Sequence, residues 1–331
     1  MALISREVHL KSRPVGEPVD GDFAYIERTI DPPGAGEVLV QNIYMSVDPY
    51  MRGRMREAWD LDRVLEGAAV GKVIKSQNKH FEEGTYVTSS KSWREYFISD
   101  GSNISPIDAG LAPISAYLGI MGMPGLTAYG GLLITGQLKE GETVFVSAAS
   151  GAVGSVAGQI AKIKNCHVIG SAGSDEKVSH LLQEYHFDHA FNYRTSNILD
   201  ELKKGAPKGL DVYFENVGGS HLEAAIACMR EYGRIPVCGM IAHYNDSGTP
   251  TPGPTNLSTI IYNRVTLRGF NVAEFLDKQP QFLHDMSTWL REGKITYQET
   301  IFEGIEKAVE AFQGLFSGVN DGKMLVKLAE D

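Results

Sequence analysis

A strand-like run followed by a glycine-containing turn decides the fold of this chain. Residues 142–147 read Glu-Thr-Val-Phe-Val-Ser, a run of β-branched and aromatic residues that is typical of a buried strand. Residues 148–154 follow as Ala-Ala-Ser-Gly-Ala-Val-Gly, and between residues 153 and 164 apolar side chains recur at helical spacing. The sequence therefore predicts a strand, a tight turn and a helix in direct succession.

The turn is a variant of the GxGxxG fingerprint of dinucleotide-binding domains, with Ala149 in the place of the first glycine. Gly151 would let the backbone approach a pyrophosphate, and Gly154 would let the helix pack closely on the strand. The free N–H groups and the positive dipole end of the helix would face the phosphates. Many glycine-rich runs are only turns, but this one lies between a strand and a helix, which favours a dinucleotide site.

The alternation of strands and helices continues along the chain. We predict strands at 167–171, 190–191, 210–214, 233–238 and 265–269, with helices at 175–185 and 274–290. Such alternation is typical of βαβ units, and so of an α/β fold with a doubly wound parallel sheet. Before it the chain is β-rich, with predicted strands at 38–40, 69–74 and 85–88, and one more strand follows at 323–328.

Composition limits the class of protein. The chain has 331 residues, of which 43% are hydrophobic and 22% charged, so it is globular and long enough for one large or two medium domains. The net charge is −10, so a basic footprint for nucleic acid or an anionic membrane is absent. Residues 109–138 carry no charge, but glycine and proline interrupt them, so we expect buried backbone rather than a membrane span.

The three cysteines, Cys166, Cys228 and Cys238, are too few for a disulfide framework and form no CxxC pair. We expect reduced, packed thiols, as in a cytoplasmic protein. The first residues also lack the apolar core of a secretory signal.

The end of the second predicted βαβ strand bears on the choice of dinucleotide. An NAD site expects an acidic residue at the tip of that strand, but residues 172–174 are Ala-Gly-Ser, and Asp175 and Glu176 follow as helix-start residues. A 2′-phosphate needs a cation and hydrogen-bond donors. Ser174, Lys177, Tyr193 and Arg194 can supply them, although Lys177 could also be a solvated helix lysine. The combination favours NADP(H).

The chain resembles a known family over essentially its whole length. It is similar to the zinc-independent medium-chain dehydrogenase/reductases, and within them to the branch of leukotriene dehydrogenase/prostaglandin reductases, plant alkenal reductases and bacterial curcumin-reductase-like enzymes. The motifs that carry the resemblance are Val-Asp-Pro-Tyr-Met-Arg at 47–52 and the segments 125–129, 148–154, 172–177, 191–193, 215–219, 233–235 and 322–323.

The resemblance implies a split architecture and a dimer. Residues 1–120 plus 296–331 would form a GroES-like β-barrel domain, residues 121–295 a Rossmann NADP-binding domain, and the active site would lie in the cleft. The family's cofactor contacts carry over onto Ala152, Val153, Gly154, Ser155, Lys177, Tyr193, Asn216, Cys238, Gly239, Met240, Ile241, Tyr244, Phe270, Asn271, Val272 and Asn320.

The resemblance also implies an absence of zinc. All three cysteines fall in the predicted nucleotide domain, and residues 48–50, Asp-Pro-Tyr, stand where zinc-dependent relatives have a catalytic cysteine. The nine histidines show no ligand spacing such as HxxxH. We therefore expect no metal site.

Without a metal to hold an alkoxide, reduction of a conjugated double bond is easier to support than alcohol oxidation. Hydride would reach the β-carbon of a small apolar enone or enal, and a hydroxyl would stabilise the enolate oxygen. The family assigns this hydroxyl to a tyrosine that matches Tyr262, although a tyrosine on a predicted helix could equally be core. Tyr50 and Tyr244 are the next candidates, as substrate or cofactor contacts. Arg52 or Arg54 could bind a substrate carboxylate, although a solvated or ion-paired arginine is commoner.

Three other functions remain open from the sequence. A quinone oxidoreductase would have the same fold and cofactor, and a prostaglandin or leukotriene-type lipid oxidoreductase would differ only in its pocket. A non-enzymatic NADPH-binding protein that senses redox state belongs to a different class.

Overall fold

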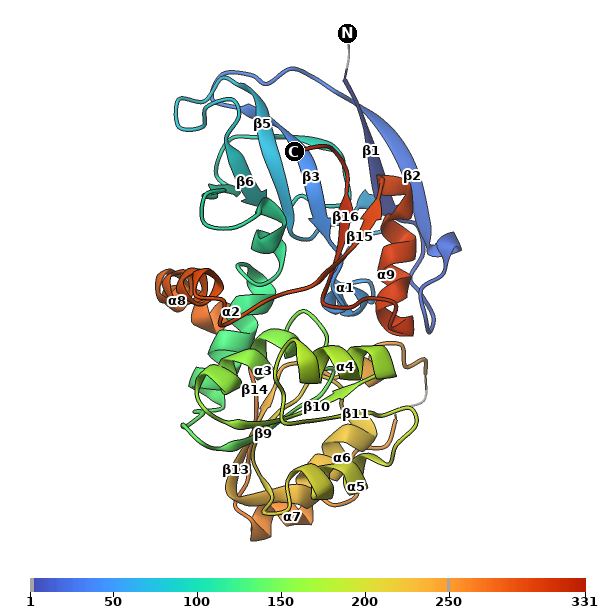
Figure 1. The fold of residues 1–331 in the computed structure, drawn as a ribbon. Coiled ribbons are helices and arrows are strands. Elements are labelled where there is room, and N and C mark those ends of the chain that lie inside the picture. The colour runs from blue at the N-terminus through green and yellow to red at the C-terminus, as the bar shows by residue number, and fades with distance from the viewer. Residues whose placement is uncertain (1–2, 249–250) are drawn as a thin grey trace. The chain divides into compact units, whose positions relative to one another are not determined.

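The structure, a computed structural model, describes residues 3–248 and 251–331. The chain divides into two compact units. Unit 1 consists of Met1–Leu118 and Glu299–Asp331, and unit 2 of Gly119–Gln298. The first unit is therefore built from both ends of the chain, as the colours of Figure 1 show, whereas the second is continuous.

Unit 1 contains two sheets. A small sheet has the order β2-β1-β4, and a larger one has the order β15-β16-β3-β5-β6-β8, with β7 pairing to β3. The strands are β1 (Leu3–Leu10), β2 (Phe23–Ile30), β3 (Val38–Ser46), β4 (Arg63–Val64), β5 (Ala69–Ser76), β6 (Tyr86–Ser89), β7 (Tyr96–Ser99), β8 (Ile104–Pro106), β15 (Glu299–Glu303) and β16 (Lys323–Lys327).

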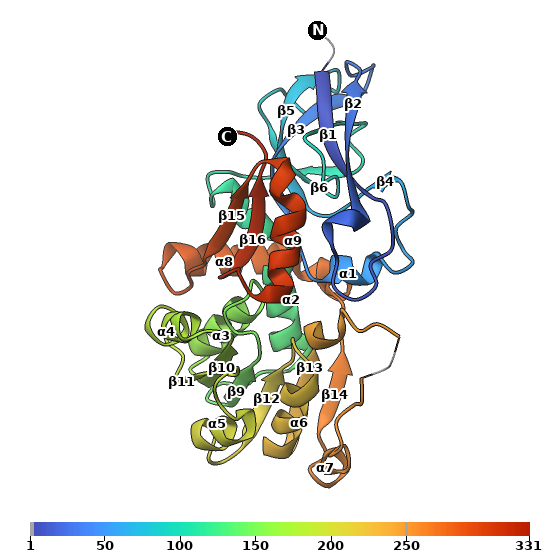
Figure 2. The same cartoon turned by 90° about the vertical axis from the view of Figure 1, so that its right-hand side faces the viewer.

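The two pieces of unit 1 share one hydrophobic core. Trp93 is fully buried, stacks on Phe23 with ring centroids 6.4 Å apart, and meets Phe312 of α9 (Ala308–Ser317) edge-on at 6.1 Å. Figure 2 shows α9 beside β1. The C-terminal piece also joins the larger sheet, because β16 pairs with β3 in the antiparallel register Leu325↔Ser46. Burial of these aromatic rings is the physical reason that the chain ends fold together.

Unit 2 is built on a six-stranded sheet of order β11-β10-β9-β12-β13-β14, in which each pairing is parallel. This confirms the predicted doubly wound α/β fold. The strand order reverses between β9 and β12, and ligands of such folds bind at the carboxyl ends of the strands beside this point. The strands are β9 (Thr143–Val146), β10 (His167–Ala172), β11 (His189–Asn192), β12 (Leu210–Phe214), β13 (Met229–Val237) and β14 (Thr266–Gly269).

Helices cover both faces of this sheet. In Figure 1, α3 and α4 lie on one face and α5 and α6 on the other. The α-helices of the chain, besides α9, are α1 (Tyr50–Arg54), α2 (Met123–Gly130), α3 (Gly154–Ile163), α4 (Asp175–Gln183), α5 (Ile198–Gly205), α6 (Gly219–Cys228), α7 (Ser258–Tyr262) and α8 (Gln279–Arg291). Shorter helical turns lie at Asp20–Asp22, Ile114–Leu118, Gly131–Thr135, Ile241–His243, Val272–Lys278 and Ile305–Lys307.

The single helix predicted at 274–290 is wrong in its first part. The chain forms a 3-10 helix at Val272–Lys278 and then the separate helix α8, with Pro280 in its first turn. A proline ring has no N–H to donate, so it is tolerated in the first turn of a helix but not inside one. Pro280 was therefore the signal for a new helix start.

The uncharged run at 109–138 is largely buried and contains α2 and a π-helical turn at Gly131–Thr135. A Cβ added at Gly130 would collide with the ring of Phe275, and one at Gly125 with the carbonyl of Ile120. Glycine is therefore needed at both positions for close packing. Among the residues described, every helix is too short or too polar to cross a membrane.

Candidate functional site

The turn after β9 brings the backbone close to the start of α3. Ala148 adopts a left-handed conformation with φ +48°, and its carbonyl accepts a hydrogen bond of 3.0 Å from the Gly151 N–H. A Cβ at Gly154 would collide with the Ala148 carbonyl, so only glycine fits there. Ala152 and Val153, which lead into α3, are half-buried, and Gly154 and Ser155, its first residues, are buried. These four residues at the helix start were predicted to meet a pyrophosphate.

The residues that follow the carboxyl ends of β10 and β11 come together at Gly173, and we call this group of residues the recess. A Cβ built on Gly173 would lie 3.3 Å from the Tyr193 hydroxyl and 3.5 Å from Arg194 Nε. Ser174 begins α4 by accepting a hydrogen bond from the Lys177 backbone N–H. The recess therefore gathers a hydroxyl, a guanidinium and a helix start.

The chemistry of this recess fits a phosphate group. Hydroxyl and guanidinium groups donate to phosphate oxygens, and a helix N-terminus favours negative charge. The carboxylate that follows, Asp175, accepts a hydrogen bond of 2.8 Å from the Asn192 side chain. Asp175 is thereby engaged by the protein itself. The residues present thus fit the 2′-phosphate of NADP(H).

A buried polar network lies at the reversal of strand order. Glu215 directly follows β12, and its Oε1 accepts hydrogen bonds from the Tyr213 hydroxyl (2.7 Å), the Val217 N–H (2.6 Å), the Gly218 N–H (2.9 Å) and Ser147 Oγ (3.2 Å). Burial raises the pKa of Glu215, whereas these donors favour its charged form. The network ties β12 to the end of β9. Glu215 was assigned no role from the sequence, although an acidic residue directly after a buried strand is a signal for such a network.

Asn216 and the segment after β13 are held to this network. The backbone carbonyl of Glu215 accepts hydrogen bonds from the N–H groups of Cys238 (2.9 Å) and Gly239 (3.1 Å), and Asn216 Nδ2 donates to the carbonyl of Ser147 (2.7 Å). Burial and the nearby carboxylate raise the pKa of Cys238 to about 12. Cys238 is therefore a protonated, packed thiol at neutral pH.

Tyr244 lies on the same carboxyl edge of the sheet. A Cβ at Gly239 would lie 2.9 Å from its hydroxyl oxygen, so the tyrosine folds back over the backbone that follows β13. Burial raises the pKa of Tyr244, against a hydrogen bond with the Met240 backbone that lowers it. The hydroxyl is protonated at neutral pH and can donate a hydrogen bond.

The predicted contacts after β14 also serve the fold. Phe270 packs against Phe214 and Phe275, with ring centroids 6.0 and 5.7 Å away. Asn271 caps the 3-10 helix at Val272–Lys278 by accepting a hydrogen bond from the Ala273 N–H. Since β14 is parallel to β13, these residues lie at the carboxyl edge too. Asn320 belongs to unit 1, and its side chain donates to the Gly322 carbonyl (3.0 Å).

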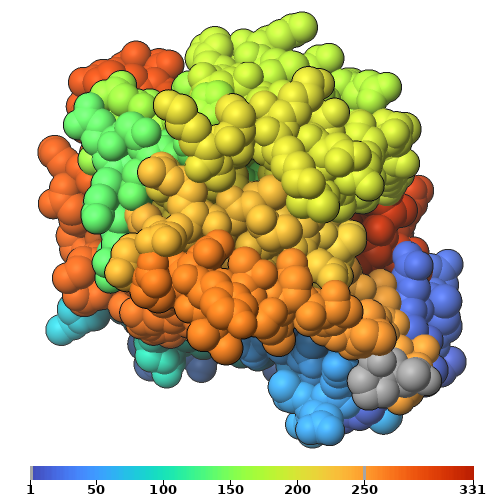
Figure 3. Space-filling model, turned by 90° about the horizontal axis from the view of Figure 1, so that it is seen from below, coloured from blue at the N-terminus to red at the C-terminus, as the bar shows by residue number. Residues whose placement is uncertain are grey.

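Tyr262 does not lie at the carboxyl edge of the unit 2 sheet. It ends α7, which precedes the amino end of β14, and its exposed fraction is 75%. Figure 3 shows this segment, coloured orange, at the surface. The alternative that Tyr262 is a core residue is therefore wrong. Within one copy of unit 2, Tyr262 lies at the opposite edge of the sheet from Tyr244, so the structure does not bring these candidates together.

The candidates of unit 1 differ in exposure. Tyr50, at the start of α1, is 37% exposed, and the Arg54 guanidinium lies over its ring at 5.5 Å. Arg52 is only 2% exposed and donates to the carbonyls of Gly16 (2.8 Å) and Pro14 (3.1 Å). Arg52 is therefore buried rather than solvated, and its role toward a substrate carboxylate stays a prediction.

The comparisons with known proteins cover both units. Residues 6–107 match the family described as the N-terminal domain of oxidoreductase, and residues 152–288 match the one described as zinc-binding dehydrogenase. In the part of the chain that the structure describes, no group of three or more His, Cys, Asp or Glu could hold a metal ion.

The relatives match over almost the full length of the chain. Prostaglandin reductase 1 of Sus scrofa is 46% identical over 96% of this chain and 97% of its own. The NADP(+)-dependent 2-alkenal reductase of Nicotiana tabacum is 42% identical over 99% and 98%. The crystal structure of CurA from Vibrio vulnificus in complex with NADPH has a TM-score of 0.92 at 39% identity, over 98% and 100%. The chain belongs to the medium-chain dehydrogenase/reductase family, in the branch that includes prostaglandin reductase 1 and the 2-alkenal reductases.

Proposed function

We propose that the protein is an NADPH-dependent reductase of the carbon–carbon double bond of α,β-unsaturated ketones and aldehydes. The observation that carries this is the carboxyl edge of the unit 2 sheet, where the tight turn before α3 and the donor-rich recess at Gly173 fit NADP(H). The relatives support the reaction, since one is named for 2-alkenal reduction, and the similar CurA structure holds NADPH.

The chain's own residues bind and orient the cofactor. The start of α3 takes the pyrophosphate, and the recess formed by Ser174, Lys177, Tyr193 and Arg194 takes the 2′-phosphate. Asn216 and the segment Cys238–Tyr244, fixed by the Glu215 network, face the nicotinamide half. When bound, NADPH supplies the hydride that adds to the β-carbon of the substrate.

A hydroxyl group stabilises the enolate. Negative charge develops on the substrate carbonyl oxygen as hydride adds at the β-carbon, and a donor aimed at that oxygen lowers the barrier. Protonation of the enolate at its α-carbon by a proton from solvent completes the reduction to the saturated carbonyl compound. Tyr244 lies on the dinucleotide edge and stays protonated at neutral pH, so we assign it this role first. Tyr262 is the alternative, and since it lies at the other edge, a second copy of the chain would have to supply it.

We further propose that the protein forms a homodimer and that it is located in the cytoplasm. We propose that its two domains span residues 1–120 plus 296–331 and residues 121–295. Tyr50 and Arg52 remain proposed contacts of the substrate, and catalysis proceeds without a metal. The protein needs no nucleic acid or membrane partner for this reaction.

The test is NADPH oxidation by the purified protein with a medium-chain enone, with the saturated ketone, a quinone and NADH as controls. We expect turnover with enone and NADPH. Replacement of an oxyanion-stabilising donor lowers kcat by on the order of 100-fold, and we expect this for Tyr244→Phe. Tyr262→Phe is the matched variant. A large loss in Tyr262→Phe alone would transfer the role to Tyr262, and activity on the quinone alone would overturn the proposed function in favour of a quinone oxidoreductase.

A further inference from the structure

A lysine is fully enclosed at the start of β16. Lys323 is 4% exposed, and its Nζ donates to the carbonyls of Val47 (2.9 Å) and Met324 (2.8 Å) and lies 3.2 Å from Asp48 Oδ1. Asp48 is 5% exposed, and its other oxygen accepts a hydrogen bond from Ser46 Oγ. The three N–H groups of Lys323 therefore have three oxygen partners, two of them on the segment that follows β3.

The Lys323 side chain joins β16 to the β3 side of the sheet beyond the point where their backbone pairing ends. The ladder between β16 and β3 stops at the pair Leu325↔Ser46, and beyond it the backbones of the two strands are no longer paired. The Lys323 side chain reaches across to the next two residues of the β3 side, Val47 and Asp48. It thereby fixes the chain immediately before Pro49 and helix α1.

Helix α1 depends on such anchors because it is short. It spans five residues, Tyr50–Arg54, and a helix of this length is not stable by itself. At its entry it is held through Asp48, and in its middle Arg52 is bound to the carbonyls of Pro14 and Gly16. Tyr50, at the start of the helix, remains partly exposed.

The buried ion pair is better explained by geometry than by stability. Desolvation of two charges roughly cancels their attraction, and a well-packed apolar pair of similar size often stabilises a fold as well or better. An apolar pair has no directional contact, whereas the ion pair and the hydrogen bond to Val47 are directional and orient the backbone before Tyr50. We propose that Lys323, through Asp48 and Val47, is a positioning residue that directs Tyr50 toward the enone substrate, an inference that rests on the proposed function.

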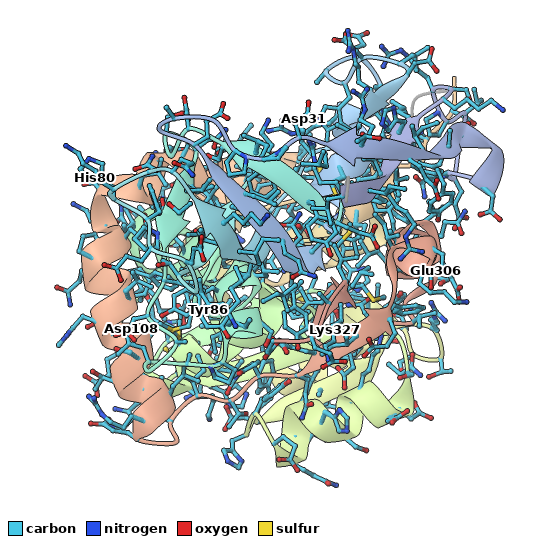
Figure 4. The ribbon with its side chains drawn as sticks, turned by 90° about the horizontal axis from the view of Figure 1, so that it is seen from above. Asp31, His80, Tyr86, Asp108, Glu306 and Lys327 are labelled. Carbon is cyan, nitrogen blue, oxygen red and sulfur yellow. The ribbon has the colours of Figure 1, made fainter. Side chains whose placement is uncertain are left out.

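The test separates positioning from stability. We would compare Lys323→Met with the double variant Lys323→Met/Asp48→Asn, which also removes the charge of the buried partner Asp48, and with Lys327→Met as the control. Lys327, labelled in Figure 4, lies on the same strand but pairs with the exposed Glu330. The measurements are kcat, KM for the enone and Kd for NADPH, each in the wild-type and the Tyr50→Ala background.

We expect both Lys323 variants to raise the KM for the enone about tenfold, as small misplacements of a substrate contact do, while Kd for NADPH is unchanged. In the Tyr50→Ala background the effect should vanish, because the lysine acts through Tyr50. Lys327→Met should behave as wild type. An equal rise in KM in both backgrounds would overturn the proposal, and so would a wild-type KM in the folded double variant.

A second readout does not depend on activity. With 3-fluorotyrosine incorporated, the ¹⁹F resonance of Tyr50, assigned by its loss in Tyr50→Phe, should shift or split in the Lys323 variants and stay unchanged in Lys327→Met. If the wild type failed to reduce enones, the proposed function would be wrong. The ¹⁹F resonance of Tyr50 would still show whether the contacts of Lys323 with Asp48 and Val47 position Tyr50. An unchanged Tyr50 resonance in either Lys323 variant would overturn the positioning role.

Discussion

His221, in the first turn of α6, is a buried histidine. It is 3% exposed, lies parallel to the ring of Phe145 at 6.4 Å and meets the ring of Tyr193 edge-on at 5.1 Å. Among the described residues, its Nε2 finds no hydrogen-bond partner. Burial lowers the pKa of His221 from 6.5 to about 4, so the imidazole is neutral at neutral pH.

This shift predicts how stability changes with pH. Between pH 6.5 and about 4 the unfolded chain binds a proton at His221 and the folded chain does not, so the free energy of unfolding falls as the pH falls through this range. His221→Phe should remove this loss, which amounts to at most about 3 kcal/mol. Urea unfolding at neutral pH and in the acidic range would measure it. His284→Gln, on an exposed position of α8, is the control, and equal pH slopes in wild type and His221→Phe would refute the prediction.

At the scale of single residues, the sequence predicts which side chains can bind a phosphate better than it predicts which distant residues a side chain contacts. The donors Tyr193 and Arg194 meet at Gly173 because both follow β11, and the resemblance had already pointed to the region. The burial of Arg52 among the carbonyls of Pro14 and Gly16 was not predictable, since it depends on contacts between distant parts of the chain. The same holds for the pairing of Lys323 with Asp48.

At the scale of elements, the phosphate recess combines the end of β10, the start of α4 and the end of β11. Removing a cation from it should weaken NADPH binding and leave NADH binding unaffected, because only NADPH carries the 2′-phosphate. We expect Lys177→Ala to raise the Kd for NADPH about tenfold, equivalent to ~1.4 kcal/mol.

Fluorescence titration of both cofactors would measure this effect. Lys203→Ala, on the exposed side of α5, removes an equal charge from unit 2 away from the recess and serves as the control. An equal change of Kd in the two variants would mean that Lys177 acts only through net charge. A rise in Kd for NADH as well would mean that the variant disturbs α4 rather than the phosphate contact.

Elements with strong local signals were predicted, and those set by tertiary packing were not. The β9–turn–α3 unit is where the sequence places it, because strand pattern, glycine spacing and helical period agree there. The split of the predicted helix at Pro280 was missed, because the apolar spacing continues through the 3-10 turn. The start of β13 at Met229 was also missed, since a bulge with Tyr232 at φ +61° interrupts its pattern.

At the scale of the whole molecule, the periodicity of hydrophobic residues does not predict that unit 1 is assembled from both ends of the chain. Pairing of β16 with β3 and of Phe312 with Trp93 joins residues far apart in sequence, and only the family resemblance predicted it. Periodicity reports which face of an element is buried, but not which distant element covers it. The continuous unit 2, by contrast, follows from short βαβ connections between neighbours in sequence.

The proposed homodimer has a matching surface on unit 2. β14 is the last strand of the sheet order, so one of its edges has no strand partner in residues 3–248 and 251–331. Beside it, Leu257, Ile261, Tyr262 and Leu267 are exposed. Open strand edges and apolar patches are both places where a second chain adds.

Two copies that pair through β14 about a two-fold axis would run antiparallel, so the amino end of one strand would lie beside the carboxyl end of the other. Tyr262 of one copy would then approach the carboxyl end of β14, near Phe270, in the other copy. Tyr262 lies at the amino end of its own sheet, but in such a dimer it could reach the cofactor site of the second copy. We expect Ile261→Glu/Leu267→Lys to convert a dimer into a monomer in light scattering coupled to gel filtration. Leu182→Glu, an exposed leucine on α4, is the control. A dimer that survives the double variant would locate the interface elsewhere and remove Tyr262 from the candidates for the enolate hydroxyl.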